Sequence, residues 1–210
     1  MLSKKIKICG MKNLQSIEGI SQLNIDFMGF IFYPKSKRFI DENFSVEAIL
    51  SVPKSIKKVG VFVNEDINKL MKIHQKFSLD YVQLHADESP EYCTNLNEKG
   101  IKMIKAFQVN TDFNFENLSA YENLVDFFVF DSPTPLYGGS GNSFNWELLS
   151  NYQGKTPFLL SGGLGLHNIR QALECNHSML AGFDINSKIE IIPGEKNIVQ
   201  ATQIVEIIMN

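Results

Sequence analysis

The sequence predicts a single (β/α)₈ barrel domain over residues 1–210, and three observations lead to this fold class. Short apolar strands and amphipathic helices alternate along the whole chain. Eight strand-then-helix units follow one another and average about 26 residues each, which places the chain near the lower size limit of such barrels. No linker or low-complexity segment separates the units. The alternation indicates a parallel sheet covered by helices. A doubly wound open sheet is the alternative, but it would usually have fewer strands and a glycine fingerprint after the first one.

Each expected strand is a short apolar run that ends at a polar residue or a glycine. The runs are residues 6–9, 27–32, 58–63, 81–85, 101–107, 127–130, 158–160 and 180–185. The second of them is apolar throughout, which is typical of a strand buried on both faces.

The expected helices lie between these runs and have apolar residues at helical spacing. Asn13 can cap a helix that begins near Leu14, and Ser89 followed by Pro90 has the pattern of a cap with a first-turn proline. Further helices are expected around Val46, Ile49 and Leu50; Ile67, Leu70, Met71 and Phe77; Trp146, Leu148 and Leu149; Ile169, Ala172 and Leu173; and Ile198, Ala201, Val205 and Ile208.

Composition and charge are those of an ordinary soluble globular protein. The net charge is -3, so no basic field favours nucleic acid or an anionic membrane as a partner. No apolar run approaches the roughly 20 residues that span a bilayer, and the basic N-terminus has no signal-peptide core. The three cysteines are widely spaced and fit neither a disulfide framework nor a zinc site. We therefore expect a reduced, cytoplasmic protein, either a monomer or a homodimer.

The candidate site residues lie where the expected strands end. In a barrel the carboxyl ends of all strands open onto one face, which carries the active site. The residues collected there are Cys9, Arg38, Gln83, His85, Asp131, Gly162, Gly163 and Ser187. Backbone amides of the turns after the seventh and eighth strands can hold a phosphate, as such turns commonly do in barrels. The structural alternative for the two glycines is a tight turn that requires positive φ.

Cys9 and Asp131 are candidates for a base and an acid. Asp131 follows four apolar residues, and burial beside them would raise its pKa towards that of a general acid. Cys9 could act as a base only through its thiolate. The simpler alternatives are a capping aspartate and a small buried hydrophobic cysteine. An acid and a base at one mouth with a phosphate site suggest proton transfer on a sugar phosphate.

These motifs resemble those of the phosphoribosylanthranilate isomerase family of tryptophan biosynthesis. The similar segments are KICGMKN (7–13), GFIFYPKSKR (29–38), VGVFVNE (59–65), VQLH (82–85), YGGSG (137–141), FNW (144–146) and LSGGL (160–164). They occur in the family's order and span almost the whole chain. The resemblance implies the isomerisation of N-(5-phosphoribosyl)anthranilate to a 1-deoxyribulose 5-phosphate by an Amadori rearrangement, without metal or cofactor.

The resemblance also implies roles for individual residues. Cys9 would be the general base, Asp131 the general acid, and Arg38 the partner of the anthranilate carboxylate, for which a planar guanidinium is well shaped. Gly162, Gly163 and Ser187 would hold the phosphate. Gln83 and His85 are expected to contact the substrate.

One segment departs from the family pattern. After the eighth strand the family usually has Asp-Val-Ser-Ser-Gly-Val-Glu, whereas this chain has DINSKIE (184–190), with Lys188 in place of the glycine. If that position requires positive φ, Lys188 strains or reshapes the turn. We hypothesise that the Lys188 ammonium partly compensates by contacting the phosphate.

Three rival interpretations remain open at this point. A Schiff-base aldolase could use Lys7 or Lys105; the alternative for both is inward-facing polar packing. A barrel that binds a sugar phosphate without chemistry is possible, but Cys9, Asp131 and Arg38 are all present. A related sugar isomerase of the histidine pathway would be expected to have an aspartate where this chain has Cys9.

Overall fold

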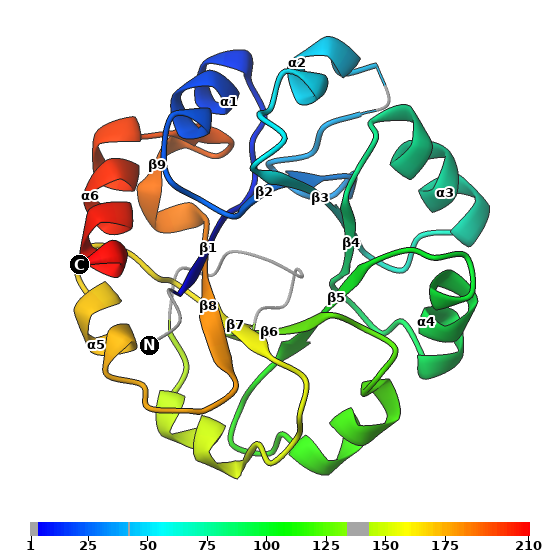
Figure 1. Ribbon diagram of the computed structural model, residues 1–210, viewed down its shortest axis with the longest axis vertical. Helices are drawn as coiled ribbons and strands as arrows, with labels where there is room; N and C mark the ends of the chain where they lie inside the picture. Colours follow the sequence, from blue (N-terminus) through cyan, green and yellow to red (C-terminus); the bar gives the residue numbers. More distant parts are fainter. Residues whose placement is uncertain (1–3, 42, 134–142) are drawn as a thin grey trace.

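The computed structural model describes residues 4–41, 43–133 and 143–210, and these form a closed eight-stranded parallel barrel. The strands are hydrogen-bonded in chain order from β1 to β8, and β8 pairs with β1 to close the ring. Helices surround the ring on its outside (Figure 1). The predicted fold class is confirmed.

All eight predicted strands are present, and most of their boundaries differ from the prediction by one or two residues. The strands are β1 Lys5–Ile8, β2 Phe27–Ile31, β3 Lys57–Phe62, β4 Tyr81–Leu84, β5 Met103–Gln108, β6 Phe127–Asp131, β7 Phe158–Leu160 and β8 Leu180–Ile185. Cys9 and His85 lie just beyond their strands, yet their amides still donate to Ile185 and Phe62 of the neighbouring strands, each over 2.9 Å. Both side chains are therefore placed by the barrel itself.

The helices follow the predicted apolar patterns. They are α1 Leu14–Ser21, α2 Val46–Leu50, α3 Ile67–Lys76, α4 Pro90–Asn97, α5 Ile169–Leu173 and α6 Ile198–Met209. The predicted caps are confirmed: Asn13 accepts from Ser16 N over 2.7 Å, and Ser89 accepts from Tyr92 N over 3.2 Å. Among the described residues, the connections after β5 and β6 contain the 3₁₀ segments η1 Phe115–Tyr121 and η2 Trp146–Asn151, so the helix expected around Trp146 is a 3₁₀ helix. Short units of this kind help an eight-unit barrel to fit into 210 residues.

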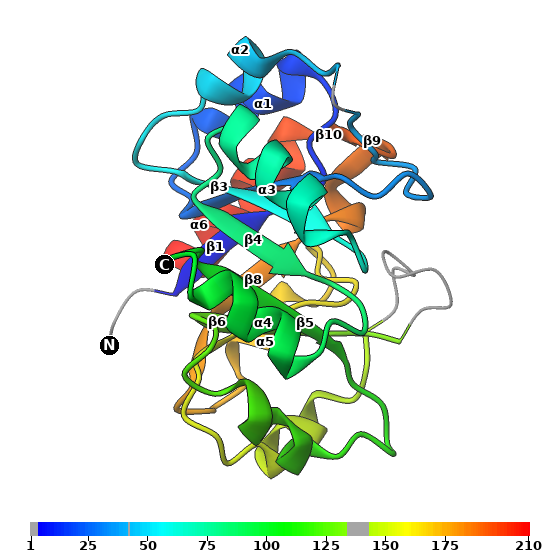
Figure 2. The ribbon, with the colours of Figure 1, turned by 90° about the vertical axis from the view of Figure 1, so that its right-hand side faces the viewer.

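A small hairpin that the sequence analysis did not predict follows β8. The 3₁₀ turn η3 Ser187–Ile189 leads into β9 Glu190–Ile192, which pairs antiparallel with β10 Glu195–Lys196. Between them Gly194 has a φ of 92°, which suits glycine in a tight turn. In Figure 2 this hairpin lies at the opposite side of the molecule from the C-terminus, so it borders the carboxyl ends of the strands.

Apolar side chains fill the barrel below the strand ends. The interior cluster consists of Phe27, Val59, Ile104, Ala106, Val129 and Leu159. Phe27 of β2 meets Phe127 of β6 edge-on, with ring centroids 5.8 Å apart, and so contacts a strand that is not its neighbour. A larger apolar cluster packs between the strands and the helices. Because the lower interior is filled, polar groups inside the barrel are concentrated towards its carboxyl-terminal mouth.

Candidate active site

The Cys9 thiol is buried at the end of β1, against the backbone of β2. The residue is 4% exposed. Gly29 of β2 lies opposite, and a Cβ at that position would stand only 2.6 Å from Cys9 Sγ. No side chain larger than hydrogen therefore fits at position 29 while the thiol keeps its place.

A buried ion pair lies beneath the thiol. Lys7 precedes Cys9 by two positions on the same strand face, is fully buried, and donates to Asp184 Oδ2 over 2.7 Å. The two residues are register partners in the β1–β8 pairing. Burial favours the neutral amine, but Asp184 and Cys9 outweigh it and raise the pKa of Lys7, so this side chain stays charged.

The burial of Cys9 and the charges of this ion pair shift the pKa of its thiol. Burial is the largest influence and raises the pKa of the thiol, whereas the charge of Lys7 acts in the opposite direction. Asp184 raises the pKa further, Lys196 lowers it, and the net pKa is above its ordinary value. The thiol is thus the resting form at neutral pH, and a neighbouring ammonium is in place to stabilise the thiolate when it forms.

Asp131, His85 and Gln83 form a second polar group at the mouth. Asp131 is the last residue of β6; its Oδ1 accepts from Ser132 N over 2.8 Å, and its Oδ2 lies 3.3 Å from His85 Nε2. Gln83 Nε2 lies 2.8 Å from His85 Nδ1. With the Gln83 amide as donor, Nδ1 accepts, and a neutral His85 carries its proton on Nε2, facing Asp131.

Several buried polar atoms at this mouth have no protein partner. Among the described residues they include Gln83 Oε1, Ser132 Oγ and Asp184 Oδ1, while His85 Nε2 has only the 3.3 Å contact with Asp131 Oδ2. Asp184 belongs to the same group as Asp131. Burial is the largest influence and raises the pKa of Asp184, whereas the Lys7 pair lowers it. The charge of Asp131 raises this pKa further, and that of His85 lowers it. Unpartnered buried acceptors and donors are costly unless a ligand or water meets them. Their concentration here is what a binding site for a hydroxyl-rich ligand requires.

Arg38 reaches the mouth from the loop after β2, but part of its guanidinium is already engaged. Nε and Nη2 donate to the Glu190 carboxylate, with Nε–Oε1 at 2.8 Å and Nη2–Oε2 at 2.6 Å. The Arg38 side chain crosses over Gly10, where a Cβ would come within 2.7 Å of Arg38 Cδ. The guanidinium therefore sits beside the end of β1, close to the residue that follows Cys9.

The turns after β7 and β8 lie against each other. Gly162 and Gly163 have φ values of 92° and 64°, and a Cβ at Gly162 would overlap Ser132. A Cβ at Gly165 would stand 2.7 Å from Lys188 Cβ, so the two turns touch. In the part of the chain that the structure describes, no protein acceptor takes the amides of Gly162, Gly163 or Ser187. These amides are free to bind an anion.

Of the two outcomes expected at Lys188, a strained turn or a reshaped one, the structure shows no positive φ at this position. Lys188 lies within η3 and is not among the described non-glycine residues with positive φ, which are Asn64, Ser78 and Asn123. The turn has adopted a 3₁₀ conformation that an L-residue tolerates, and the Lys188 side chain is exposed.

Comparisons with known proteins agree with one another. The family model described as N-(5'-phosphoribosyl)anthranilate (PRA) isomerase matches residues 6–207. A protein of that name from Parabacteroides distasonis is 46% identical over 194 residues, covering 92% of this chain and 88% of the relative. The chain belongs to this family.

Solved structures of PRA isomerases have the same fold. The Thermotoga maritima enzyme superposes with a TM-score of 0.80 at 32% identity, with 98% of each chain covered. A second PRA isomerase, described in complex with reduced 1-(o-carboxyphenylamino)-1-deoxyribulose 5-phosphate, gives a TM-score of 0.78 at 30% identity, with 97% of each chain covered. The phosphoribosylanthranilate isomerase resemblance drawn from the motifs is therefore confirmed.

The structure brings the predicted site residues to one end of the barrel, although the segment YGGSG (137–141) lies outside the described residues. It also adds two carboxylates to which the sequence analysis gave no role, Asp184 and Glu190. Both occur in the segment that was aligned with the family pattern, so the signal was present. Their functions depend on the partners Lys7 and Arg38, which are far away in the sequence.

Lys105 does not face the barrel interior, contrary to the expectation for it. Its neighbours Ile104 and Ala106 belong to the interior cluster, so Lys105 points outward, where it is buried and bonded to Glu88 over 3.1 Å. Lys7 does face inward, but as the partner of Asp184. Neither geometry favours a Schiff-base lysine.

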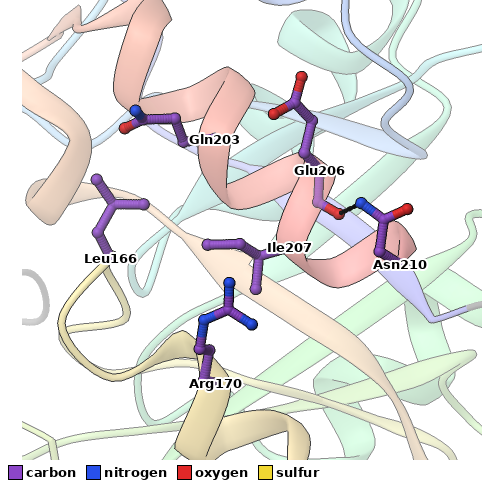
Figure 3. Close-up of a pocket in the computed structure, with 6 residues that line it drawn as sticks. All are labelled: Leu166, Arg170, Gln203, Glu206, Ile207 and Asn210. Atoms are coloured by element: carbon purple, nitrogen blue, oxygen red, sulfur yellow. Dashed lines mark hydrogen bonds between the residues drawn. The ribbon is translucent and has the colours of Figure 1, made fainter.

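One hollow of the described surface lies apart from this site. A hollow of about 570 Å³ lies on the outside of the barrel between α5 and α6 (Figure 3). It is lined by Leu166, Arg170, Gln203, Glu206, Ile207 and Asn210, none of which is a predicted site residue. Within the described ranges, no group of three His, Cys, Asp or Glu side chains is arranged to hold a metal ion, and no helix there is long and apolar enough to cross a membrane.

Proposed function

We propose that this PRA isomerase family member converts N-(5'-phosphoribosyl)anthranilate to 1-(2-carboxyphenylamino)-1-deoxyribulose 5-phosphate, with Cys9 as general base and Asp131 as general acid. The observation that carries the assignment is the placement of a buried thiol and a carboxyl group at the ends of β1 and β6, at one mouth of the barrel. The family match over residues 6–207 supports the reaction.

The chemistry suits the two groups. Asp131 protonates the furanose ring oxygen, and the ring opens to a Schiff base between the sugar carbon and the anthranilate nitrogen. Cys9 then removes the C2′ proton, and the electron pair moves to give an enolamine, which tautomerises to the ketone. His85 Nε2, 3.3 Å from Asp131 Oδ2, is placed to orient the acid. Positioned acids and bases each contribute on the order of 10²–10⁴ in rate.

The unpartnered Asp184 Oδ1 supports a role for this residue in binding the sugar. Lys7 holds Asp184 through Oδ2, and within the described part of the chain Oδ1 has no hydrogen-bond partner. A ribose hydroxyl is a suitable donor to it. In this assignment Lys7 both supports the thiolate of Cys9 and fixes Asp184.

Arg38 and the glycine turns are assigned to the two ends of the substrate. Of the five N–H groups of a guanidinium, Glu190 engages those on Nε and Nη2, and the outer edge formed by Nη1 and Nη2 can still receive the anthranilate carboxylate. The amides of Gly162, Gly163 and Ser187 are assigned to the phosphate. The ligand named for the related structure carries both a carboxyphenyl group and a 5-phosphate.

Lys188 is expected to contribute to phosphate binding from its exposed position beside the glycine turn. Replacing it by glycine should raise KM several-fold with little change in kcat, because an ammonium near the phosphate acts on bound substrate and transition state alike. Steady-state kinetics of Lys188→Gly checks this. An unchanged or lower KM would remove Lys188 from the site.

The proposed reaction is tested by following turnover of phosphoribosylanthranilate, generated in place, through the loss of anthranilate fluorescence. The native chain should consume the substrate without added metal or cofactor. Absence of turnover by a folded native chain, together with binding of a reduced product analogue, would instead indicate a barrel that binds a sugar phosphate without chemistry. Monomer and homodimer both remain predictions; a related Thermotoga maritima enzyme is described as dimeric.

A further inference from the structure

Glu190 connects the loop after β2 with the β9–β10 hairpin at the mouth of the barrel. Its Oε1 accepts from Arg38 Nε over 2.8 Å, from Lys196 Nζ over 2.8 Å and from Gly194 N over 3.0 Å, and its Oε2 accepts from Arg38 Nη2 over 2.6 Å. The Glu190 side chain is only 5% exposed and that of Arg38 12%. One carboxylate thus joins the loop after β2 to both strands of the β9–β10 hairpin.

The carboxylate is ionised in this setting. Burial alone would raise the pKa of Glu190, but the bonds from Arg38 and Lys196 outweigh it and hold the pKa below its ordinary value. Burial lowers the pKa of Lys196 to about 8, against the opposing charge of Glu190. The two cations Arg38 and Lys196 therefore share one anion, and without it they would repel each other.

The geometry of the pairing selects which edge of Arg38 remains for a ligand. A guanidinium offers two bidentate edges, and Glu190 occupies the Nε–Nη2 edge. The Arg38 side chain also runs across Gly10, in space that a Cβ at this position would take, since it would come within 2.7 Å of Arg38 Cδ. Only the outer Nη1–Nη2 edge is left, and its direction is set by the Glu190 bonds.

We propose that Glu190 is a positioning residue for substrate specificity, which fixes the Arg38 guanidinium so that its outer edge receives the carboxylate of the aromatic amine. This inference rests on the assignment of Arg38 under the proposed function. It predicts that Glu190 matters for ligands with that carboxylate and hardly at all for ligands without it.

Two ligands separate positioning from a merely structural role. The first is reduced 1-(2-carboxyphenylamino)-1-deoxyribulose 5-phosphate, and the second is the same compound with an unsubstituted phenyl ring. Dissociation constants from calorimetry should show that Glu190→Gln weakens the first ligand about ten- to a hundredfold, the range for a charged hydrogen bond. The second ligand should change by less than about threefold, since it makes no contact with Arg38. Equal weakening of both ligands, or of neither, would overturn the proposal.

Three further variants complete the experiment. Glu195→Gln removes the same charge from the same hairpin at a residue with no bond to Arg38, and it should bind both ligands like the native chain. Arg38→Gln tests the underlying assignment: if it weakens both ligands equally, the assignment of Arg38 fails, whereas a selective loss with Arg38→Gln but not with Glu190→Gln refutes the positioning role alone. If Glu190→Gln does not fold, Glu190→Asp keeps the charge on a shorter side chain and should show the same selectivity with a smaller loss. If Glu190→Asp changes the dissociation constants of both ligands by the same factor relative to the native chain, the proposal is refuted.

Discussion

Replacing Cys9 by alanine is expected to lower kcat for phosphoribosylanthranilate by about 10²–10⁴-fold, the range for loss of a positioned base. Alanine fills part of the same buried space next to Gly29 but cannot take the C2′ proton. Single-turnover and steady-state assays by anthranilate fluorescence measure the loss. Cys175→Ala is the matched control, because it removes a half-buried thiol that is not at the strand ends.

The pH dependence of kcat/KM for the native chain should reflect the ionisation of the same thiol. Burial raises the pKa of Cys9 above its ordinary value, so the thiolate fraction increases with pH throughout the neutral range. If the thiolate is the base, kcat/KM should still be rising at about pH 8. A Cys9→Ala variant within tenfold of the native rate would show that another group removes the proton.

Replacing Asp131 by asparagine is expected to lower kcat by a similar factor of about 10²–10⁴. The asparagine oxygen can still accept from Ser132 N, as Asp131 Oδ1 does over 2.8 Å, so the end of β6 should keep its conformation. What is lost is the acidic proton that opens the furanose ring. KM should change much less than kcat, since the ring oxygen is protonated only during the reaction.

A second aspartate, just before the same strand, provides the control for this variant. Asp126 precedes β6 at the opposite end of the barrel, where its Oδ2 accepts from Met103 N over 2.9 Å. Asp126→Asn should leave kcat close to the native value. Equal losses in Asp126→Asn and Asp131→Asn would point to a general effect on the strand and would remove Asp131 from its assigned role.

The positions of the candidate acid and base were predictable because they follow from local patterns and one topological rule. Short apolar runs predict the strands, and parallel strands in a closed barrel bring their carboxyl ends together. Cys9 and Asp131 end the first and sixth runs. Their position at one mouth of the barrel can therefore be predicted without knowing any side-chain contact. The caps Asn13 and Ser89 were predictable for the same reason, since each bonds to an amide three positions further on.

The β9–β10 hairpin and the turn at Lys188 were not predictable in this way. The hairpin strands are only three and two residues long, too short for a period to be recognised. The sequence indicated a strained or reshaped turn at Lys188 only through the family pattern, and it did not indicate the 3₁₀ turn in which the chain accommodates the lysine. The turn packs against the loop at Gly165, and no local sequence period predicts that contact.

The sequence by itself determined the barrel, the strand ends and the residue types that reach the mouth, because strand and helix periodicity are local properties of the chain. Only the tertiary structure decided how the charges are paired. Lys7 meets Asp184 across 177 positions, and Arg38 meets Glu190 across 152. These pairs form because barrel closure sets β8 in register with β1 and the hairpin after β8 folds back over the loop after β2. They establish which ammonium supports the thiol of Cys9 and which edge of Arg38 remains for the substrate.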